Sequence, residues 1–580
     1  MLQSTSQYKK KLNGWLSYAF ASEVFVIVSL TLFLPICLEQ FARDNGFLMP
    51  DKTEPCGAVK SVPANASAED IAALGEEVRC VVKIGWMWID SASFSLYVYS
   101  ISVALQALTV ISMGGIADHP PHRKLLLLSF ALLGAAAATT FLALPSSSPI
   151  WWLSAFLAMC ANVGFGASVV AMNAYLPSLA KEAPEVQAAL KALEDSRETD
   201  EENTFPQSAE REVDHDSEGS DSSTAPLIPS SSPSSSSPSP KLKTEYENTL
   251  SRTTSRISSL GIALGYGAGI FGLILALIPV TKMGGSTFAL RLAIGLSGVW
   301  WAVFTIPAAI WLPGASPRDG NSNWERTEAK WNTRREIVKA WVRLRDMLRW
   351  REIQKLRNTF KFLAAWFLLS DGFTTITSTA ILFGKTTLHM SPSSLILIGV
   401  LTPTSGIVGS LVWPVIQRKM GWSNLRVLIT LVLLASFIPV YGCLGFVFQG
   451  RTKFGGLTTQ SEMWGLAVYF GSVYGAFQGY ARAFYAELLP PGEEARWYGL
   501  FSITDKSSSF LGPLIVGLIS DTTGNIRYGF FVLIVMIWAA VPILLSVDVE
   551  RGRQDAREYT IDGERGRDTP SSTTGNGVHI

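Results

Sequence analysis

Long apolar stretches alternate with polar segments along most of the 580-residue chain. A membrane-spanning helix needs roughly 20 mostly apolar residues, and twelve stretches meet this requirement. They lie near residues 15–38, 92–116, 124–144, 151–175, 257–280, 290–312, 361–383, 393–416, 425–447, 463–486, 499–519 and 527–547. The pattern predicts an all-α membrane protein whose twelve transmembrane helices form two six-helix halves, at 1–312 and 361–548.

The composition agrees with a membrane protein and excludes several other classes. Hydrophobic residues make up 48% of the chain and charged residues 16%, which is too apolar for a soluble protein of this length. The net charge of +1 gives no field that would attract nucleic acid, and five cysteines are too few for a disulfide scaffold. The first apolar stretch is long enough to span a membrane, so we expect no cleaved signal peptide.

Basic residues in the loops predict the orientation of the spans. Lysines and arginines gather before span one and in the segments between spans two and three, six and seven, and eight and nine. The loops on the other side are nearly free of basic clusters. Because cytosolic loops carry an excess of Lys and Arg, we expect both termini in the cytosol.

Three polar segments interrupt or follow the spans. Residues 181–247 are acidic and then rich in Ser and Pro, and the tail 549–580 is similar, so both are expected to be disordered in the cytosol. The linker 313–360 has apolar residues at helical spacing among arginines over 334–356. This pattern fits an amphipathic helix in the membrane interface, and it fits a solvated linker helix equally well.

The loop at 39–91 is the only long loop predicted on the lumenal side. It contains the sequon at Asn65, which is an N-glycosylation acceptor if the loop is lumenal. It also contains Cys56 and Cys80, which could form a disulfide in an oxidising lumen. Together these features indicate a glycoprotein in a membrane of the secretory pathway.

The two halves echo each other around one carboxylate each. Glu23 lies in the first span of the first half, and Asp371 lies in the first span of the second half. Aligning these two residues also matches Ser22 with Ser370 and Phe25 with Phe373. An ionisable group in a span is costly and is usually functional.

Two interpretations of these carboxylates remain open. A carboxylate in an apolar wall is hard to ionise and could carry protons between an acidic lumen and the cytosol. Alternatively, Glu23 and Asp371 form structural ion pairs with Arg482 or Lys506. Arg482 could instead bind a substrate carboxylate or extend to the cytosolic interface. The substrate or proton pathway then has these candidates: Glu23, Asp371, Arg482, Asn173, Lys506 and Asp505.

The loop between spans two and three reads GGIADHPPHRK. It resembles the loop motif of the major facilitator superfamily, in which a glycine and an aspartate precede basic residues. The matching residues are Gly114, Asp118, Arg123 and Lys124. We expect them to form a cytosolic latch between two states of the protein, although an ordinary polar turn would also explain them. Gly261, Gly265 and Gly269 share one face of span five and predict close helix packing.

An ordered set of segments resembles one branch of this superfamily. YAFASE opens the first span, NVGFGASVVAMNAYLPSLA begins at Asn162, GIALGYGAG follows the long insertion, and SITDKSSSFLGP begins at Ser502. Together they resemble the fungal autophagy-related protein 22 family. The resemblance implies a major facilitator fold and a vacuolar membrane protein that exports neutral, leucine-like amino acids to the cytosol after autophagic breakdown. It carries over no catalytic residues, cofactor or metal.

Transport would proceed by alternating access and could be coupled to protons. Two other functions are alternatives to it. A lumenal membrane-degrading enzyme is disfavoured because the chain has no G-x-S-x-G motif, and His389 is the only histidine expected on the lumenal side. A non-transporting nutrient sensor that signals through 181–247 remains an alternative. The expected partners are amino acids, protons and the lipid bilayer.

Overall fold

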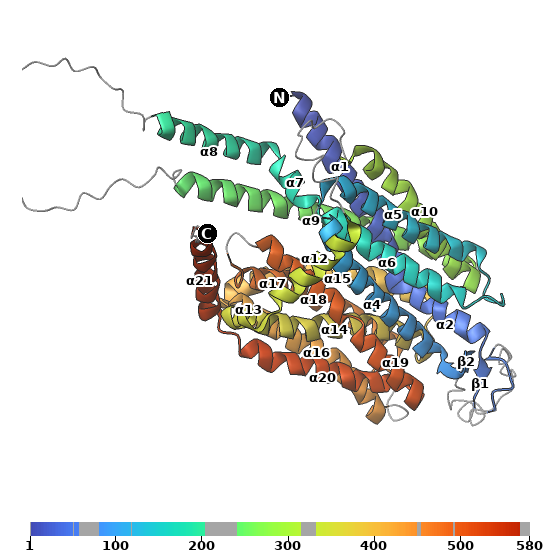
Figure 1. Cartoon of the computed structure of the whole chain (residues 1–580). Coiled ribbons are helices and arrows are strands. Elements are labelled where there is room, and N and C mark those ends of the chain that lie inside the picture. Colours follow the sequence, from blue (N-terminus) through green and yellow to red (C-terminus); the bar gives the residue numbers. More distant parts are fainter. Residues whose placement is uncertain are drawn as a thin grey trace, which may run out of the picture.

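The computed structural model describes residues 2–49, 51–56, 80–117, 119–202, 240–314, 332–448, 454–490 and 494–568. Its helices follow the two predicted halves (Figure 1). The first half contains α1 (Leu2–Val24), the π-helix η1 (Phe25–Phe33), α2 (Leu34–Asp44), α4 (Ser91–Ala117), α5 (Pro120–Thr140), η3 (Phe141–Ala143), α6 (Leu153–Asn173), α7 (Leu176–Lys181), α8 (Pro184–Glu202), α9 (Pro240–Lys282) and α10 (Thr287–Trp311).

The linker and the second half complete the chain. The linker contains α12 (Thr333–Met347) and α13 (Trp350–Lys355). The second half contains α14 (Arg357–Thr386), α15 (Pro392–Met420), α16 (Asn424–Phe448), α17 (Gln460–Ala486), α18 (Glu494–Ser508), α19 (Leu511–Thr523), η4 (Ile526–Tyr528) and α20 (Gly529–Leu545), and α21 (Val549–Asp568) follows it.

Ten helical segments of the described chain are long and apolar enough to cross a membrane. The other two predicted spans, 463–486 and 499–519, coincide with α17 and with the pair α18 and α19. Charged and polar residues make α17 and α18 less apolar than the other spans. The break between α18 and α19 also leaves each of these two helices too short to span a membrane alone. A mostly helical membrane protein is therefore confirmed, while a count of twelve crossings stays a prediction.

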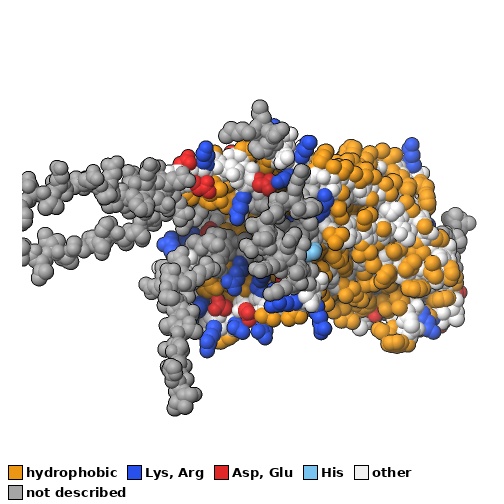
Figure 2. Space-filling view, turned by 45° about the horizontal axis from the view of Figure 1, so that its top comes forward, with side chains coloured by type: hydrophobic (Ala, Val, Ile, Leu, Met, Phe, Trp, Pro, Cys, Tyr) orange, Lys and Arg blue, Asp and Glu red, His pale blue; other side chains and the backbone are white. Residues whose placement is uncertain are grey.

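The two ends of the helical bundle differ in character. The start of α1, the end of α21 and the free ends of α8 and α9 lie at one end, which we call the terminal side, and the strands lie at the opposite end, the sheet side (Figure 1). Hydrophobic side chains form a broad band over the visible face, whereas Lys and Arg gather toward the terminal side (Figure 2). This distribution matches a membrane protein whose central band of hydrophobic side chains contacts lipid.

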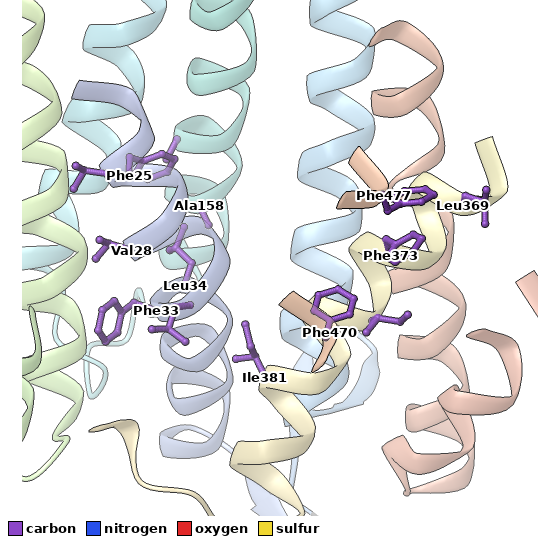
Figure 3. Close-up of a cluster of buried hydrophobic side chains, with 14 of the residues drawn as sticks. Phe25, Val28, Phe33, Leu34, Ala158, Leu369, Phe373, Ile381, Phe470 and Phe477 are labelled. Atoms are coloured by element: carbon purple, nitrogen blue, oxygen red, sulfur yellow. The ribbon is translucent and has the colours of Figure 1, made fainter. Parts of the chain in front are cut away.

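The spans pack through small and aromatic residues. A Cβ added at Gly261, Gly265 or Gly269 of α9 would lie within 2.6 Å of a side chain of the first span, so the predicted close packing of this face is confirmed. In the second half, Phe373 stacks on Phe477 with ring centroids 4.1 Å apart (Figure 3). Phe25, which the sequence alignment matched with Phe373, is equally buried and stacks on a tryptophan of α10.

Parts of the segments expected to be disordered are helical. Within 181–247, α8 packs beside α9, and Arg256 Nη1 lies 3.0 Å from Glu185 Oε1. Residues 203–239 lie outside the described chain. The tail forms α21, and Arg553 Nη2 lies 2.6 Å from Glu487 Oε2 at the end of α17. The expectation of disorder was therefore wrong for 184–202 and 549–568, because contacts with the bundle stabilise polar helices there.

The predicted helix over 334–356 is two helices, α12 and α13. The chain breaks between them at Leu348 and Arg349. Trp341 Nε1 of α12 donates a hydrogen bond to Ser112 Oγ of α4 at 3.1 Å. The linker therefore packs on the terminal end of the first half.

The loop between α2 and α4 contains a small antiparallel sheet. Its strands are β1 (Phe47–Leu48), β2 (Cys80–Ile84) and β3 (Met87–Asp90), in the order β1-β2-β3. Cys56 and Cys80 form a disulfide, with Cα atoms 5.9 Å apart. The sequon at Asn65 lies outside the described residues. Strand β3 leads directly into α4, so the sheet is joined to the bundle at the start of the second span.

Candidate functional site

Glu23 lies at the point where the first span changes its helical form. It is the next-to-last residue of α1, immediately before the π-helix η1, and π-helical segments are often found at functional sites. Gly265 of α9 allows the side chain to fit, because a Cβ at this position would lie 2.4 Å from Glu23 Cγ. The Glu23 carboxylate makes no hydrogen bond to any residue that the structure describes, and Lys506 of the other half lies within electrostatic range.

Asp371 lies at the equivalent place in α14 but in different surroundings. Its side chain is buried. The backbone N–H of Gly512 donates to both carboxylate oxygens, at 3.0 and 2.9 Å, and Thr375 Oγ1 lies 3.5 Å from Oδ1. Asp371 therefore caps the N-terminus of α19, where backbone N–H groups lack partners within the helix.

The eleventh predicted span is broken next to the residue that Asp371 binds. Helix α18 ends at Ser508 and α19 begins at Leu511, just before Gly512 and Pro513. A Cβ at Gly512 would lie 2.0 Å from Thr375 Oγ1 and 2.9 Å from Asp371 Oδ1. Only glycine lets the backbone approach the carboxylate this closely.

Asp505 and Lys506 lie near the end of α18, just before the break. Ser370 donates a hydrogen bond to Asp505 Oδ1, and Lys506 Nζ lies 3.3 Å from Asp505 Oδ2. The side chains of Asp505 and Lys506 are 28% and 44% exposed. The charges of Asp505 and Lys506 are therefore partly exposed, whereas Asp371 beside them is buried.

Tyrosines from both halves surround these charges. Tyr99 of α4 lies within electrostatic range of Asp505 and Asp371, and Tyr266 of α9 lies within range of Glu23. Tyr474 of α17 is near Asp505 and both of these tyrosines, and its hydroxyl accepts a hydrogen bond from Gln478 Nε2 at 2.9 Å. We call this group of side chains the central cluster: Glu23, Tyr99, Tyr266, Asp371, Tyr474, Asp505 and Lys506.

Two of the predicted pathway residues lie nearer the terminal side. Arg482 of α17 is exposed and lies within electrostatic range of Tyr266 of the other half. Asn173 is the last residue of α6, and its side chain is exposed. The suggested ion pairs with Asp371 do not form, because its carboxylate is bound to Gly512. Lys506 pairs with Asp505 and faces Glu23 at longer range.

The loop motif stabilises the terminal end of the first half. Arg123 Nε donates to the Ala117 carbonyl oxygen at 2.9 Å, and its guanidinium lies 4.9 Å from the Tyr175 ring centroid. Lys124 Nζ donates to the Leu312 carbonyl oxygen at 3.0 Å. Asp118 lies outside the described residues. At Gly114 an added Cβ would meet no described atom within 4 Å, so close helix approach does not explain this glycine in the observed conformation.

One ion pair on the sheet side was not predicted from the sequence. Lys385 of α14 pairs with Glu39 of α2, which is fully buried and also accepts a hydrogen bond from Arg43 Nε at 2.8 Å. Each residue lies just beyond the predicted end of the first span of its half. An acid and a base at matching ends of repeated spans are a signal that could have revealed this pair.

Comparison with known proteins agrees with this architecture. The autophagy-related protein 22 of Cryptococcus neoformans strain JEC21 is 44% identical over 572 residues, which cover 94% of this chain and 96% of that protein. Autophagy-related protein 22-1 of Neosartorya fischeri is 39% identical over 94% of this chain and 91% of its own length.

Two solved transporters share the fold. A D-xylose–proton symporter superposes with a TM-score of 0.50 at 11% identity, over 94% of this chain and 98% of that chain. A variant of the nucleoside transporter NupG gives the same score and identity, over 93% and 99% of the two chains. The family described as "Vacuole effluxer Atg22 like" matches residues 7–557. The chain is therefore a membrane transporter with the major facilitator fold, and it belongs to the Atg22 family.

Proposed function

We propose that the protein exports neutral amino acids from the vacuole lumen to the cytosol by alternating access, with protons as the coupling ion. The terminal side would face the cytosol and the sheet side the lumen. The central cluster carries this proposal, because it places both signs of charge and three tyrosines between the halves of a transporter. Transporters with two repeated halves bind their substrates at such a position.

The accessible charges match the two ends of an amino acid. Lys506 would bind the substrate carboxylate, and Asp505 would bind its ammonium group, because charge-assisted hydrogen bonds are the stronger ones. The rings of Tyr99, Tyr266 and Tyr474 would contact an apolar side chain, and the Tyr474 hydroxyl would keep its hydrogen bond from Gln478. Asp505 and Lys506 pair with each other when no substrate separates them.

Glu23 is the better candidate for the proton carrier. Its carboxylate has no hydrogen bond to hold it ionised, and it faces Lys506 at long range. A substrate carboxylate bound to Lys506 would take away the cation that faces Glu23, and this would couple substrate binding to the charge of Glu23. Asp371, in contrast, is held by the N–H group of Gly512, so we assign it a structural role.

Counterflow of labelled amino acids tests this function. The full chain is reconstituted in vesicles that are loaded with unlabelled leucine, and uptake of label is followed at an acidic and at a neutral lumenal pH. Substrate-dependent exchange is expected, and Lys506→Gln is expected to lower apparent affinity. Lys282→Gln, an exposed lysine on the sheet side, serves as the matched control. Absence of exchange with every amino acid, by a folded protein, would favour the nutrient sensor instead.

The orientation has its own test. If the sheet side is lumenal, the sequon at Asn65 is available for N-glycosylation. Glycosidase treatment should then increase the electrophoretic mobility of the wild-type protein and leave Asn65→Gln unchanged. A protease site placed after residue 568 should be cut in intact vacuoles from the cytosolic side. Cleavage only after the vacuoles are lysed would reverse the orientation.

The loop motif is proposed as a latch on the cytosolic side. Arg123 and Lys124 join the terminal ends of α4, α5 and α10. Glu336 of the linker also approaches this loop, with Oε2 3.6 Å from His119 Nε2. Hydrogen bonding to Lys339 lowers the pKa of Glu336, so this carboxylate is ionised at cytosolic pH. The linker could therefore follow or resist movement of this loop as the halves rock.

A further inference from the structure

A buried ion pair joins the two halves on the sheet side. Besides its ion pair with Glu39, the Lys385 ammonium donates to the Ile36 carbonyl oxygen at 2.9 Å and to Gln40 Oε1 at 3.2 Å. Glu39 is fully buried, so its charge depends on protein partners. The first span of one half is thus fastened to the first span of the other.

Glu39 also has partners within its own half. Arg43 lies one turn later on α2 and donates to Oε1 at 2.8 Å, and Ser91 Oγ lies 3.4 Å from the same oxygen. If the halves separated on this side, Glu39 would keep Arg43 while Lys385 passed into the entering water. The contact can therefore open without leaving an unpaired charge in apolar surroundings, which would be very costly.

A second set of contacts joins β3 and α4 of the first half to α19 and the residue before it. The backbone N–H of Asp90 donates to Asp521 Oδ1 at 2.8 Å, and Ser100 Oγ donates to the Phe510 carbonyl oxygen at 2.6 Å. Between these contacts, a Cβ at Gly517 would lie 3.4 Å from Leu96 Cβ. On the terminal side, in contrast, the linker helix α12 contacts the first half and Arg482 and Asn173 are exposed.

We propose that Lys385 and Glu39 form the gate on the sheet side, and that the pair must break each time the central cluster opens to that side. The inference rests on the alternating access proposed above. The observed conformation is the one in which this gate is closed. Lys385 then sets the balance between the closed and open states, and Arg43 holds Glu39 in both of them.

A disulfide across the closed gate provides the test. Leu96→Cys and Gly517→Cys would place two Cβ atoms near the spacing of about 3.5–4.5 Å that disulfides require. The three free cysteines, Cys37, Cys160 and Cys443, are replaced by alanine, while Cys56 and Cys80 stay. The full chain in membrane vesicles is treated with a mild oxidant, and the linked peptides are quantified over time by mass spectrometry.

The gate variants are compared within this cysteine background. Lys385→Gln should slow cross-linking by at least about fivefold, since loss of the pair shifts the population toward the open state. Lys385→Arg, which keeps the charge, should restore most of the rate, and the exposed Lys282→Gln should leave it unchanged. The Tyr97 ring must shift slightly to admit the cysteine at 517, but every variant shares this perturbation.

Two results would overturn the gate. One is an unchanged cross-linking rate in a folded Lys385→Gln protein, which would make the pair a structural contact. The other is equal slowing by Lys385→Gln and Lys282→Gln, which would reflect surface charge alone. If Lys385→Gln fails to fold, Asp521→Ala tests the second contact and should also slow the reaction. The assay needs no substrate, so a chain that transports no amino acid could still confirm the gate.

Discussion

Glu23 and Asp371 occupy equivalent places in the two halves, and each faces a glycine in the fifth span of its own half. Gly265 belongs to the continuous helix α9, in which its N–H group is used within the helix. Gly512 lies at the start of α19, after a break, so its N–H group can bind Asp371. The break in span eleven thus gives Asp371 a backbone hydrogen-bond donor, and the unbroken helix α9 gives none to Glu23.

Equivalent carboxylates in the two repeated halves thus differ in their hydrogen bonding. The same residue class at the same position binds a backbone N–H group in one half and makes no hydrogen bond to a described residue in the other. Because the difference lies in the backbone of a neighbouring span, it can be tested by changing either the carboxylates or the glycines that face them.

The largest effect is expected from Gly512→Ala. The added methyl group would lie 2.0 Å from Thr375 Oγ1 and 2.9 Å from Asp371 Oδ1, and such overpacking costs about 3 kcal/mol. The free energy of unfolding in mixed micelles measures this loss. Gly265→Ala crowds only the more adaptable Glu23 side chain and should cost less. Equal losses would remove the distinction between the two carboxylates.

Asp371→Ala is expected to destabilise the protein by about 2 kcal/mol, because the N–H group of Gly512 is left without an acceptor in a buried site. Asp371→Asn keeps an acceptor oxygen and should recover about half of this loss. The same unfolding assay compares them. A neutral effect of both changes would contradict the capping role of Asp371.

Glu23→Gln should leave stability nearly unchanged and alter the pH response of transport. In the wild type, acidification of the lumen should accelerate exchange by about tenfold for each pH unit at most, since one site is titrated. The glutamine variant should show no such acceleration, and Asp371→Asn should retain it. A pH response that survives Glu23→Gln but not Asp371→Asn would reverse our assignment.

The smallest effects are expected from Gly267→Ala and Gly499→Ala. An alanine Cβ at either position meets no described atom within 4 Å, and alanine in a helix interior is favoured over glycine by about 0.5–1 kcal/mol. Slight stabilisation in both would show that the losses at 265 and 512 arise from contacts. A loss at 267 as large as that at 265 would point to the helix itself.

The sequence predicted the helices better than it predicted their partners. Apolar stretches of bilayer length locate most spans to within a few residues, because the bilayer allows few alternatives to a helix. The pairing of Asp371 could not be predicted, since it depends on where span eleven breaks. Glu39 and Lys385 fell just outside the predicted spans and were not considered buried. The polar helices α8 and α21 form against neighbours that a local pattern does not reveal.

The length of α9 places part of the protein well away from the membrane. Its apolar span begins at Arg256, whereas the helix begins at Pro240. At 1.5 Å per residue, the preceding part is about 24 Å long. Helix α8 runs beside it, so residues 202 and 240 lie at the far end of a pair of packed helices. If the terminal side faces the cytosol, as proposed above, a large cytosolic protein could reach residues 202 and 240 without touching lipid.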